Sequence, residues 1–202
     1  MYAGPVIVMP FIDSVHAMRS ASFMAKRAGA RGLLLAVHDD AKEGFVRVTN
    51  RMFRATESPY FGYVAQDAFP GRYWLKHAID VFKASSAQLV ALNDGKWFGA
   101  LAAYGLARRE WASRNYVGAF FHEAYRRHYA DAELSVIAAA AGALGYSPHS
   151  VLVEIDWNKD ARPVDRRDRK TFRARAASRF DGRVHSAALL KRISSEPSPG
   201  RK

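Results

Sequence analysis

The chain of 202 residues contains no cysteine. This absence excludes disulfide bonds, thiolate metal sites and a cysteine nucleophile. It is typical of proteins that work in a reducing compartment, so we expect a cytoplasmic location. The sequence also lacks any run of the ~18 to 20 apolar residues that a membrane-spanning helix needs. Its first residues, MYAGPVIVMPF, have no basic leader, so we expect no signal peptide.

Several motifs that would identify an enzyme class are also missing. The chain has no Walker phosphate loop, no G-x-G-x-x-G dinucleotide motif and no G-x-S-x-G nucleophile elbow. The segment His122-Glu123-Ala124-Tyr125-Arg126 begins like the zinc motif H-E-x-x-H. Arginine, which cannot ligate zinc, stands in the place of the second histidine, so the zinc-protease interpretation fails.

The chain is rich in apolar residues and in positive charge. Hydrophobic residues make up 49% and aromatic residues 12%, as in globular proteins. The net charge is +12, and residues 161–202 hold +9 of it, from 13 Lys/Arg and 4 Asp/Glu. Such a basic segment either meets anionic partners, such as lipid headgroups or nucleic acid, or is simply a solvated helix. We predict a folded body over 1–160 and a basic C-terminal helix with a disordered tail over 161–202.

Short apolar runs alternate with helical patterns along the body, which predicts an α/β fold with a mostly parallel sheet flanked by helices. We predict strands at 6–9, 33–37, 60–65, 88–92 and 151–155. We predict helices at 14–27, from 47 to the Ser58-Pro59 stop, and at 73–83, 120–128, 132–144 and 163–179. Residues 98–111 fit a strand or a helix, residues 145–148 read as a break, and residues 194–202 as disordered.

Carboxylates follow several of the predicted strands or open predicted helices. They are Asp39, Asp40, Asp67, Asp131 and Asp156. Oxygen ligands of this kind suit Mg²⁺ and Mn²⁺, which are usually shared with substrate phosphates. Each also has a plainer interpretation: Asp67 precedes a Pro-Gly turn and can be a turn former, and Asp131 can cap a helix.

The order of four segments resembles the GT-A glycosyltransferases, in particular the family 2-like members. The segments are VIVMPF, LLLAVHDD, RVTNRMFRATESPYFGYVAQDAFPGRYWL and YVGAFFHEAYRRHYADAELSVIA. The match runs from about Val6 to Asp156 and rests on order and spacing more than on one motif. It implies a GT-A-like (Rossmann-like) catalytic domain over 1–160, which moves a sugar from a nucleotide-sugar donor to an acceptor hydroxyl.

The resemblance also assigns roles to individual residues. Those expected to bind the donor nucleotide and its diphosphate are Pro10, Phe11, Asp39, Asp40, Arg47, Asn50 and Gln66. Asp67 takes the place of the acid that holds Mn²⁺ or Mg²⁺, with Asp156 as a further ligand. Asp131 takes the place of the base that deprotonates the acceptor. One such base and no protein nucleophile is the arrangement for an inverting transfer.

The sequence departs from the family pattern at two points. Ala65 stands where the first acid of the Asp-x-Asp motif belongs, giving Ala-Gln-Asp. The late strand has no histidine ligand and offers Glu154 or Asp156 instead. Either the site is rebuilt around a carboxylate or its dependence on metal is reduced. Two alternatives therefore stay open: an inactive relative, and a protein that binds or modifies nucleic acid through its basic segment.

The acceptor is not identified by the sequence. A glycan, a lipid-linked glycan and nucleic acid all remain candidates. The basic segment also suggests peripheral contact with an anionic membrane, where lipid-linked acceptors lie.

Overall fold

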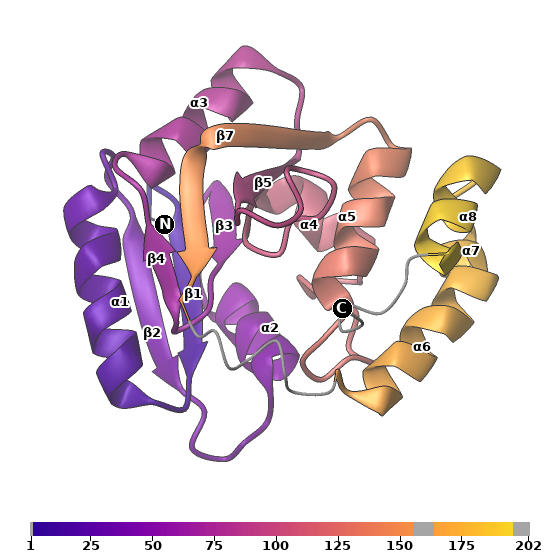
Figure 1. The fold of residues 1–202 in the computed structure, drawn as a ribbon, viewed down its shortest axis with the longest axis horizontal. Coiled ribbons are helices and arrows are strands. Elements are labelled where there is room, and N and C mark those ends of the chain that lie inside the picture. Colours follow the sequence, from indigo (N-terminus) through magenta and orange to yellow (C-terminus); the bar gives the residue numbers. More distant parts are fainter. Residues whose placement is uncertain (1, 156–163, 196–202) are drawn as a thin grey trace.

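The computed structural model describes residues 2–155 and 164–195 (Figure 1). The strands are β1 (Val6–Phe11), β2 (Leu33–His38), β3 (Tyr60–Tyr63), β4 (Ala68–Pro70), β5 (Leu89–Asn93), β6 (Gly105–Arg108) and β7 (Leu144–Glu154). The helices are α1 (Ser14–Arg27), α2 (Phe45–Ala55), α3 (Trp74–Ala84), α4 (Arg109–Asn115), α5 (Ala130–Ala140), α6 (Arg166–Ala177), α7 (Arg179–Gly182) and α8 (Ala187–Ser195). Among the described residues, none of these helices has the length and apolar character needed to cross a membrane.

The strands form one seven-stranded sheet in the order β2-β1-β3-β6-β5-β7-β4. The sheet is mixed, whereas the sequence predicted a mostly parallel one: three neighbouring pairs are parallel and three are antiparallel. One antiparallel pair is β4 with β7, and the other two come from β6, which lies in the segment left open between strand and helix. It inserts between β3 and β5 and runs antiparallel to both. Because two reversals cancel, β1, β2, β3, β5 and β7 all point in the same direction.

Both faces of the sheet are covered by helices. Alternate residues of β1 pack on opposite sides: Val6 and Val8 in one core cluster, Ile7 and Met9 in the other. The first cluster includes side chains from α2, α4, α5 and α6, and the second includes side chains from α1 and α3. This alternation is the period-2 geometry of a strand buried on both faces.

The C-terminal helices pack against the first of these clusters. Phe172, Phe180 and Val184 are buried in the same cluster as Phe61 of β3. In Figure 1, α6, α7 and α8 lie together on the far side of α5 from the sheet. The predicted boundary at residue 160 and the predicted ligand Asp156 fall in residues 156–163, outside the described residues. The disordered tail predicted over 194–202 also falls outside them from residue 196 onward.

The helix predicted at 120–128 is wrong, because that segment consists of turns and bends. Side chains that are distant in the sequence form hydrogen bonds with its backbone N–H and carbonyl groups instead. Buried Asn50 on α2 donates from Nδ2 to the carbonyl of Phe121 (2.9 Å). Its Oδ1 accepts the N–H groups of Phe120 (3.1 Å) and Phe121 (2.8 Å). Once these peptide groups bond to a side chain, they cannot join a helical ladder.

The break predicted at 145–148 is wrong as a strand end, because β7 continues through it with an irregular register. Pro148 cannot donate to the ladder, and a proline inside a strand is confined to an edge or a bulge. The β5–β7 register shifts there, between Leu92 and Asn93, and Asn93 Nδ2 donates to the carbonyl of Pro148 (2.9 Å). The bulge therefore lets one strand carry both segments.

Asn50 offers a test of how this irregular backbone is held. We expect Asn50→Ala to lower the free energy of unfolding by about 2–4 kcal/mol, because it leaves two buried N–H groups and a carbonyl without partners. Arg47→Ala, at an exposed position of the same helix, should change it by less than about 0.5 kcal/mol. Urea titration of both variants measures the difference. Equal midpoints would show that the Asn50 hydrogen bonds contribute nothing.

Candidate functional site

The carboxyl ends of five strands meet at one edge of the sheet, because these strands share a direction. Acidic residues lie at four of these ends: Asp39 after β2, Asp67 after β3, Asp94 after β5 and Glu154 at the end of β7. This is the edge at which open α/β sheets bind their ligands.

Buried Tyr104, next to the start of β6, lies within electrostatic range of several of these acids. Burial holds the pKa of Tyr104 well above its usual value, and nearby carboxylates add to the effect. The contributing carboxylates are Glu154, Asp67, Asp94 and Asp131. We call these four acids the Tyr104 cluster. Asp67 and Asp131, which are far apart in the chain, therefore both lie within electrostatic range of Tyr104.

Asp131 differs from the other members because it comes from a helix. It lies in the first turn of α5, where the backbone N–H groups of Ala132 and of Asp131 itself face its carboxylate and lower its pKa. Burial, together with the negative charge of Asp94, raises its pKa to about 6, against the lowering effect of the two N–H groups. A carboxylate with such a pKa is ionised at pH 7 yet is a stronger base than an ordinary aspartate.

A metal site was predicted from Asp67 and Asp156. Within residues 2–155 and 164–195, no group of three or more His, Asp or Glu side chains is placed to hold a metal ion. Asp67 is partly buried and directly precedes Ala68, which pairs with Glu154 on the adjacent strand β7. Lys96 lies 3.3 Å from the Glu154 carboxylate. Since Mg²⁺ and Mn²⁺ commonly take one or two carboxylates plus phosphate oxygens, these residues fit a cation shared with a ligand but not one caged by protein.

The residues predicted to bind the nucleotide fall into two sets. Phe11 and Gln66 belong to the first, at the site edge. Gln66 Oε1 accepts the N–H groups of Ile12 (2.8 Å) and Asp13 (3.0 Å), which ties the loop after β3 to the loop after β1. The Phe11 ring stacks on His38 with centroids 5.1 Å apart. Both side chains are therefore fixed where β1, β2 and β3 end.

The second set has structural contacts of its own. Buried Asp39 accepts the N–H groups of Glu43 (2.7 Å) and Gly44 (2.9 Å), so it shapes the loop before α2. Asp40 is exposed and accepts the N–H of Ala41 (2.8 Å). Pro10 is buried inside β1, opposite Val37. Arg47 is exposed, and Asn50 holds the 120–121 backbone as described above. The nucleotide roles of these residues remain predictions.

Asp94 is the member that sequence reasoning missed. The sequence Asn93-Asp94-Gly95 reads as a turn, and Asp94 does accept the N–H groups of Lys96 and Trp97, both at 2.9 Å. Its position directly after a buried strand is the signal that singled out Asp67, and the same rule would have found it. Its charge acts on both Tyr104 and Asp131.

A separate cavity lies away from this edge. It has a volume of about 440 Å³ and is lined mainly by apolar side chains of α1, α3 and the adjacent strands, including Met24, Trp74 and Leu75. None of the predicted site residues lines it. Tyr2 and Arg31 are among its lining residues, but none of the described acids is, so the Tyr104 cluster is the better candidate for chemistry.

Comparisons with known proteins find similarity in the fold and not in the sequence. No protein-family model matches the chain, and no curated protein matches it. The mannosyltransferase PcManGT from Pyrobaculum calidifontis, solved in complex with GDP-Man and Mn²⁺, superposes with a TM-score of 0.58 at 15% identity, over 98% of this chain and 67% of that chain. TarS from S. aureus superposes with a TM-score of 0.62 at 11% identity, over 92% of this chain and 41% of that chain. The chain therefore has a glycosyltransferase-like fold, and it spans less than half of TarS.

The raised pKa of Asp131 predicts a stability effect with a definite sign. Between the unfolded pKa of 3.8 and the folded pKa of about 6, the folded state keeps a proton that the unfolded state loses, so stability falls as pH rises. Above pH 6 the free energy of unfolding has fallen by the full amount, roughly 2–3 kcal/mol. We expect Asp131→Asn to raise the free energy of unfolding at pH 7 by about that amount and to have little effect below pH 4.

Asp80 on α3 provides the control for that experiment. Its pKa is lowered, first by the hydrogen bond from Lys76, so Asp80→Asn should slightly destabilise the protein at pH 7. Denaturant titration at both pH values measures the two effects. If Asp131→Asn leaves the free energy of unfolding at pH 7 unchanged or lowers it, the folded protein does not raise the pKa of this carboxylate.

Proposed function

We propose that the chain is a nucleotide-sugar-dependent glycosyltransferase in which Asp131 is the catalytic base. The observation that carries this proposal is the Tyr104 cluster: Asp131, with a pKa near 6, and Asp67 both act electrostatically on the same buried tyrosine. The glycosyltransferase-like fold supports it, and the complex of PcManGT with GDP-Man and Mn²⁺ suggests the class of donor.

The proposed reaction is a single displacement. The Asp131 carboxylate takes the proton of an acceptor hydroxyl as the hydroxyl oxygen attacks the anomeric carbon of the donor sugar. The bond from that carbon to the nucleoside diphosphate breaks, and the diphosphate leaves with the electron pair. Because attack and departure occur on opposite faces, the configuration inverts.

Negative charge builds up on the departing diphosphate and has to be neutralised. Asp67 would hold a shared Mn²⁺ or Mg²⁺ ion, which would supply that positive charge. Lys96, 3.3 Å from Glu154 at the same edge, is a further cation of this region. Because Lys96 also supplies positive charge, the reaction would depend on the metal only in part. This fits the presence of Ala65 in place of the first acid of the motif.

The donor would lie across the ends of β1, β2 and β3. In this arrangement Phe11 and Gln66 are the fixed side chains closest to the nucleotide, with Pro10, Asp39, Asp40, Arg47 and Asn50 shaping or lining the rest. Asp39 and Asn50 would act mainly by holding the loops, since their side chains already bond to backbone.

An anionic acceptor is favoured by the outer face of α6. Arg166, Arg167 and Lys170 are exposed there. Such a surface suits a lipid-linked glycan or nucleic acid, and a nucleic-acid-binding protein is the second candidate function. Binding of a labelled oligonucleotide should then weaken steeply as salt rises, because counterions are released. Failure of any oligonucleotide to bind at low salt would remove the second function.

The catalytic roles are tested by assaying release of nucleoside diphosphate from a panel of nucleotide sugars, beginning with GDP-mannose, with and without Mn²⁺. We expect Asp131→Asn to lower turnover roughly 10²- to 10⁴-fold, the usual contribution of a general base. Asp67→Ala should remove most of the stimulation by Mn²⁺. Wild-type kcat/KM should fall about tenfold for each pH unit below 6 and be flat above it, because the base must be ionised.

The matched control is Asp80→Asn, which removes an exposed carboxylate from α3 and should keep full activity. Wild-type turnover in both Asp131→Asn and Asp67→Ala would end the assignment. Nucleotide binding without turnover in the wild type would instead indicate an inactive relative.

A further inference from the structure

The start of α5, which carries Asp131, is held from outside by α6. On its N-terminal side the contact is Asp168, a carboxylate with 0% exposure. It accepts three successive backbone N–H groups: those of Arg126 (3.0 Å), Arg127 (2.8 Å) and His128 (2.9 Å). A carboxylate that accepts several N–H bonds makes strong, charge-assisted contacts. The segment that leads into α5 is therefore fixed to α6.

Tyr129, the residue directly before α5, is in a costly conformation. Its φ is +67°, in the left-handed region that non-glycine residues rarely adopt. Its ring stacks on Phe172 of α6 with centroids 5.0 Å apart. Its hydroxyl lies 3.3 Å from Nε of Arg169, also on α6. Such a conformation persists only where surrounding contacts over-determine it, and here α6 supplies them.

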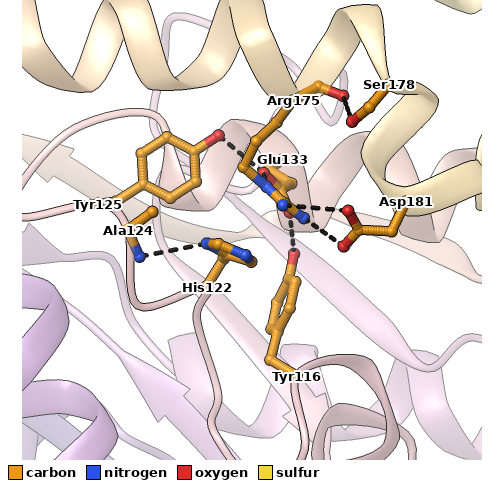
Figure 2. Close-up of polar contacts among 8 residues, drawn as sticks. All are labelled: Tyr116, His122, Ala124, Tyr125, Glu133, Arg175, Ser178 and Asp181. Carbon is orange, nitrogen blue, oxygen red and sulfur yellow. Dashed lines mark hydrogen bonds and ion pairs between the residues drawn. The ribbon is translucent and has the colours of Figure 1, made fainter.

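On the C-terminal side of Asp131 the contact is an ion pair. Glu133 has 0% exposure, and Arg175 of α6 meets both of its oxygens at 2.7 Å (Figure 2). The hydroxyls of Tyr116 (3.0 Å) and Tyr125 (2.7 Å) also donate to Glu133. Asp181 contacts the same guanidinium at 3.0 Å, so Arg175 is held between two carboxylates. A buried carboxylate is tolerated only when it is paired and bonded in this way.

Asp131 thus stands between two points at which α6 fixes the chain, Tyr129 and Glu133. We infer that α6 is a positioning element of the active site, and that Asp168 and Arg175 set the orientation of the first turn of α5 and so of Asp131. The bonds of these two residues to the 126–128 backbone and to Glu133 are what would transmit the effect. They are positioning residues and not catalytic ones. The inference rests on the proposed function for its catalytic meaning, although the positioning itself can be measured without substrate.

The substrate-free test is a double-mutant cycle. The gain in Tm from Asp131→Asn at pH 7 is measured in the wild type and in an Asp168→Asn background. The Asp168→Asn change puts an amide group in place of one accepting oxygen, so fewer hydrogen bonds hold the backbone of residues 126–128. The first turn of α5 then becomes more open to water. We expect the gain in Tm from Asp131→Asn to shrink by roughly half or more, because contacting networks are not additive. An undiminished gain would overturn the inference.

A second variant covers the case in which Asp168→Asn does not fold. Arg175→Lys keeps the positive charge beside Glu133 but loses the two-pronged geometry. The same cycle with Asp131→Asn is expected to show the same shrinkage. Ala174→Ser, at an exposed position of α6, is the matched control and should leave the gain unchanged.

The catalytic arm uses the donor assay described above. We expect Asp168→Asn to lower kcat roughly 10- to 100-fold, as small misplacements of a catalytic group do, with KM for the donor unchanged. It should also move the acid limb of the pH profile toward lower pH. Loss of stability with unchanged kcat and pH profile would make α6 merely structural. A wild type without turnover would end the proposed function, while the cycle would still decide the positioning.

Discussion

The polar backbone of the irregular segments beside the site is the constraint on which this structure depends. Loops packed against a covered sheet cannot leave N–H groups without partners, and these loops do not form helices or strands. Single side chains from distant elements satisfy them. Gln66 holds residues 12 and 13, Asn50 holds residues 120 and 121, and Asp168 holds residues 126 to 128. The geometry of the site edge is thus set by a few long-range hydrogen bonds.

Like charges also act on one buried tyrosine near this edge. The Tyr104 cluster combines acids from the ends of three strands and from one helix, and burial, followed by the charge of Asp94, raises the pKa of Asp131. A fold under selection for stability alone would disperse such charges. A carboxylate with a raised pKa beside other acids, such as Asp131, is a candidate for proton transfer in the function proposed above. The folded cores on both faces of the sheet offset the cost.

The sequence predicted what depends on local pattern and order. The apolar runs located β1, β2, β3 and β5, and the strand-end rule brought out Asp67. It could not predict what depends on partners far away in the chain. Residues 120–128 have helical composition, but bonds from Asn50 and Asp168 hold them in turns. The antiparallel insertion of β6 decides the sheet order, and nothing within residues 105–108 specifies two neighbours. The basic segment read as a surface tail, yet Phe172 and Asp168 are buried.

The burial of Glu133 has a consequence for biosynthesis. A nascent chain emerges from its N-terminus, so the sheet and α5 are made before α6. Until Arg175 follows, Glu133 would have to be buried without its cation or remain solvated, with α5 undocked. The second state costs less, so α5 should dock late, together with α6. The half-made protein would have most of its sheet but no docked first turn of α5, so the position of Asp131 would be set only after α6 has left the ribosome.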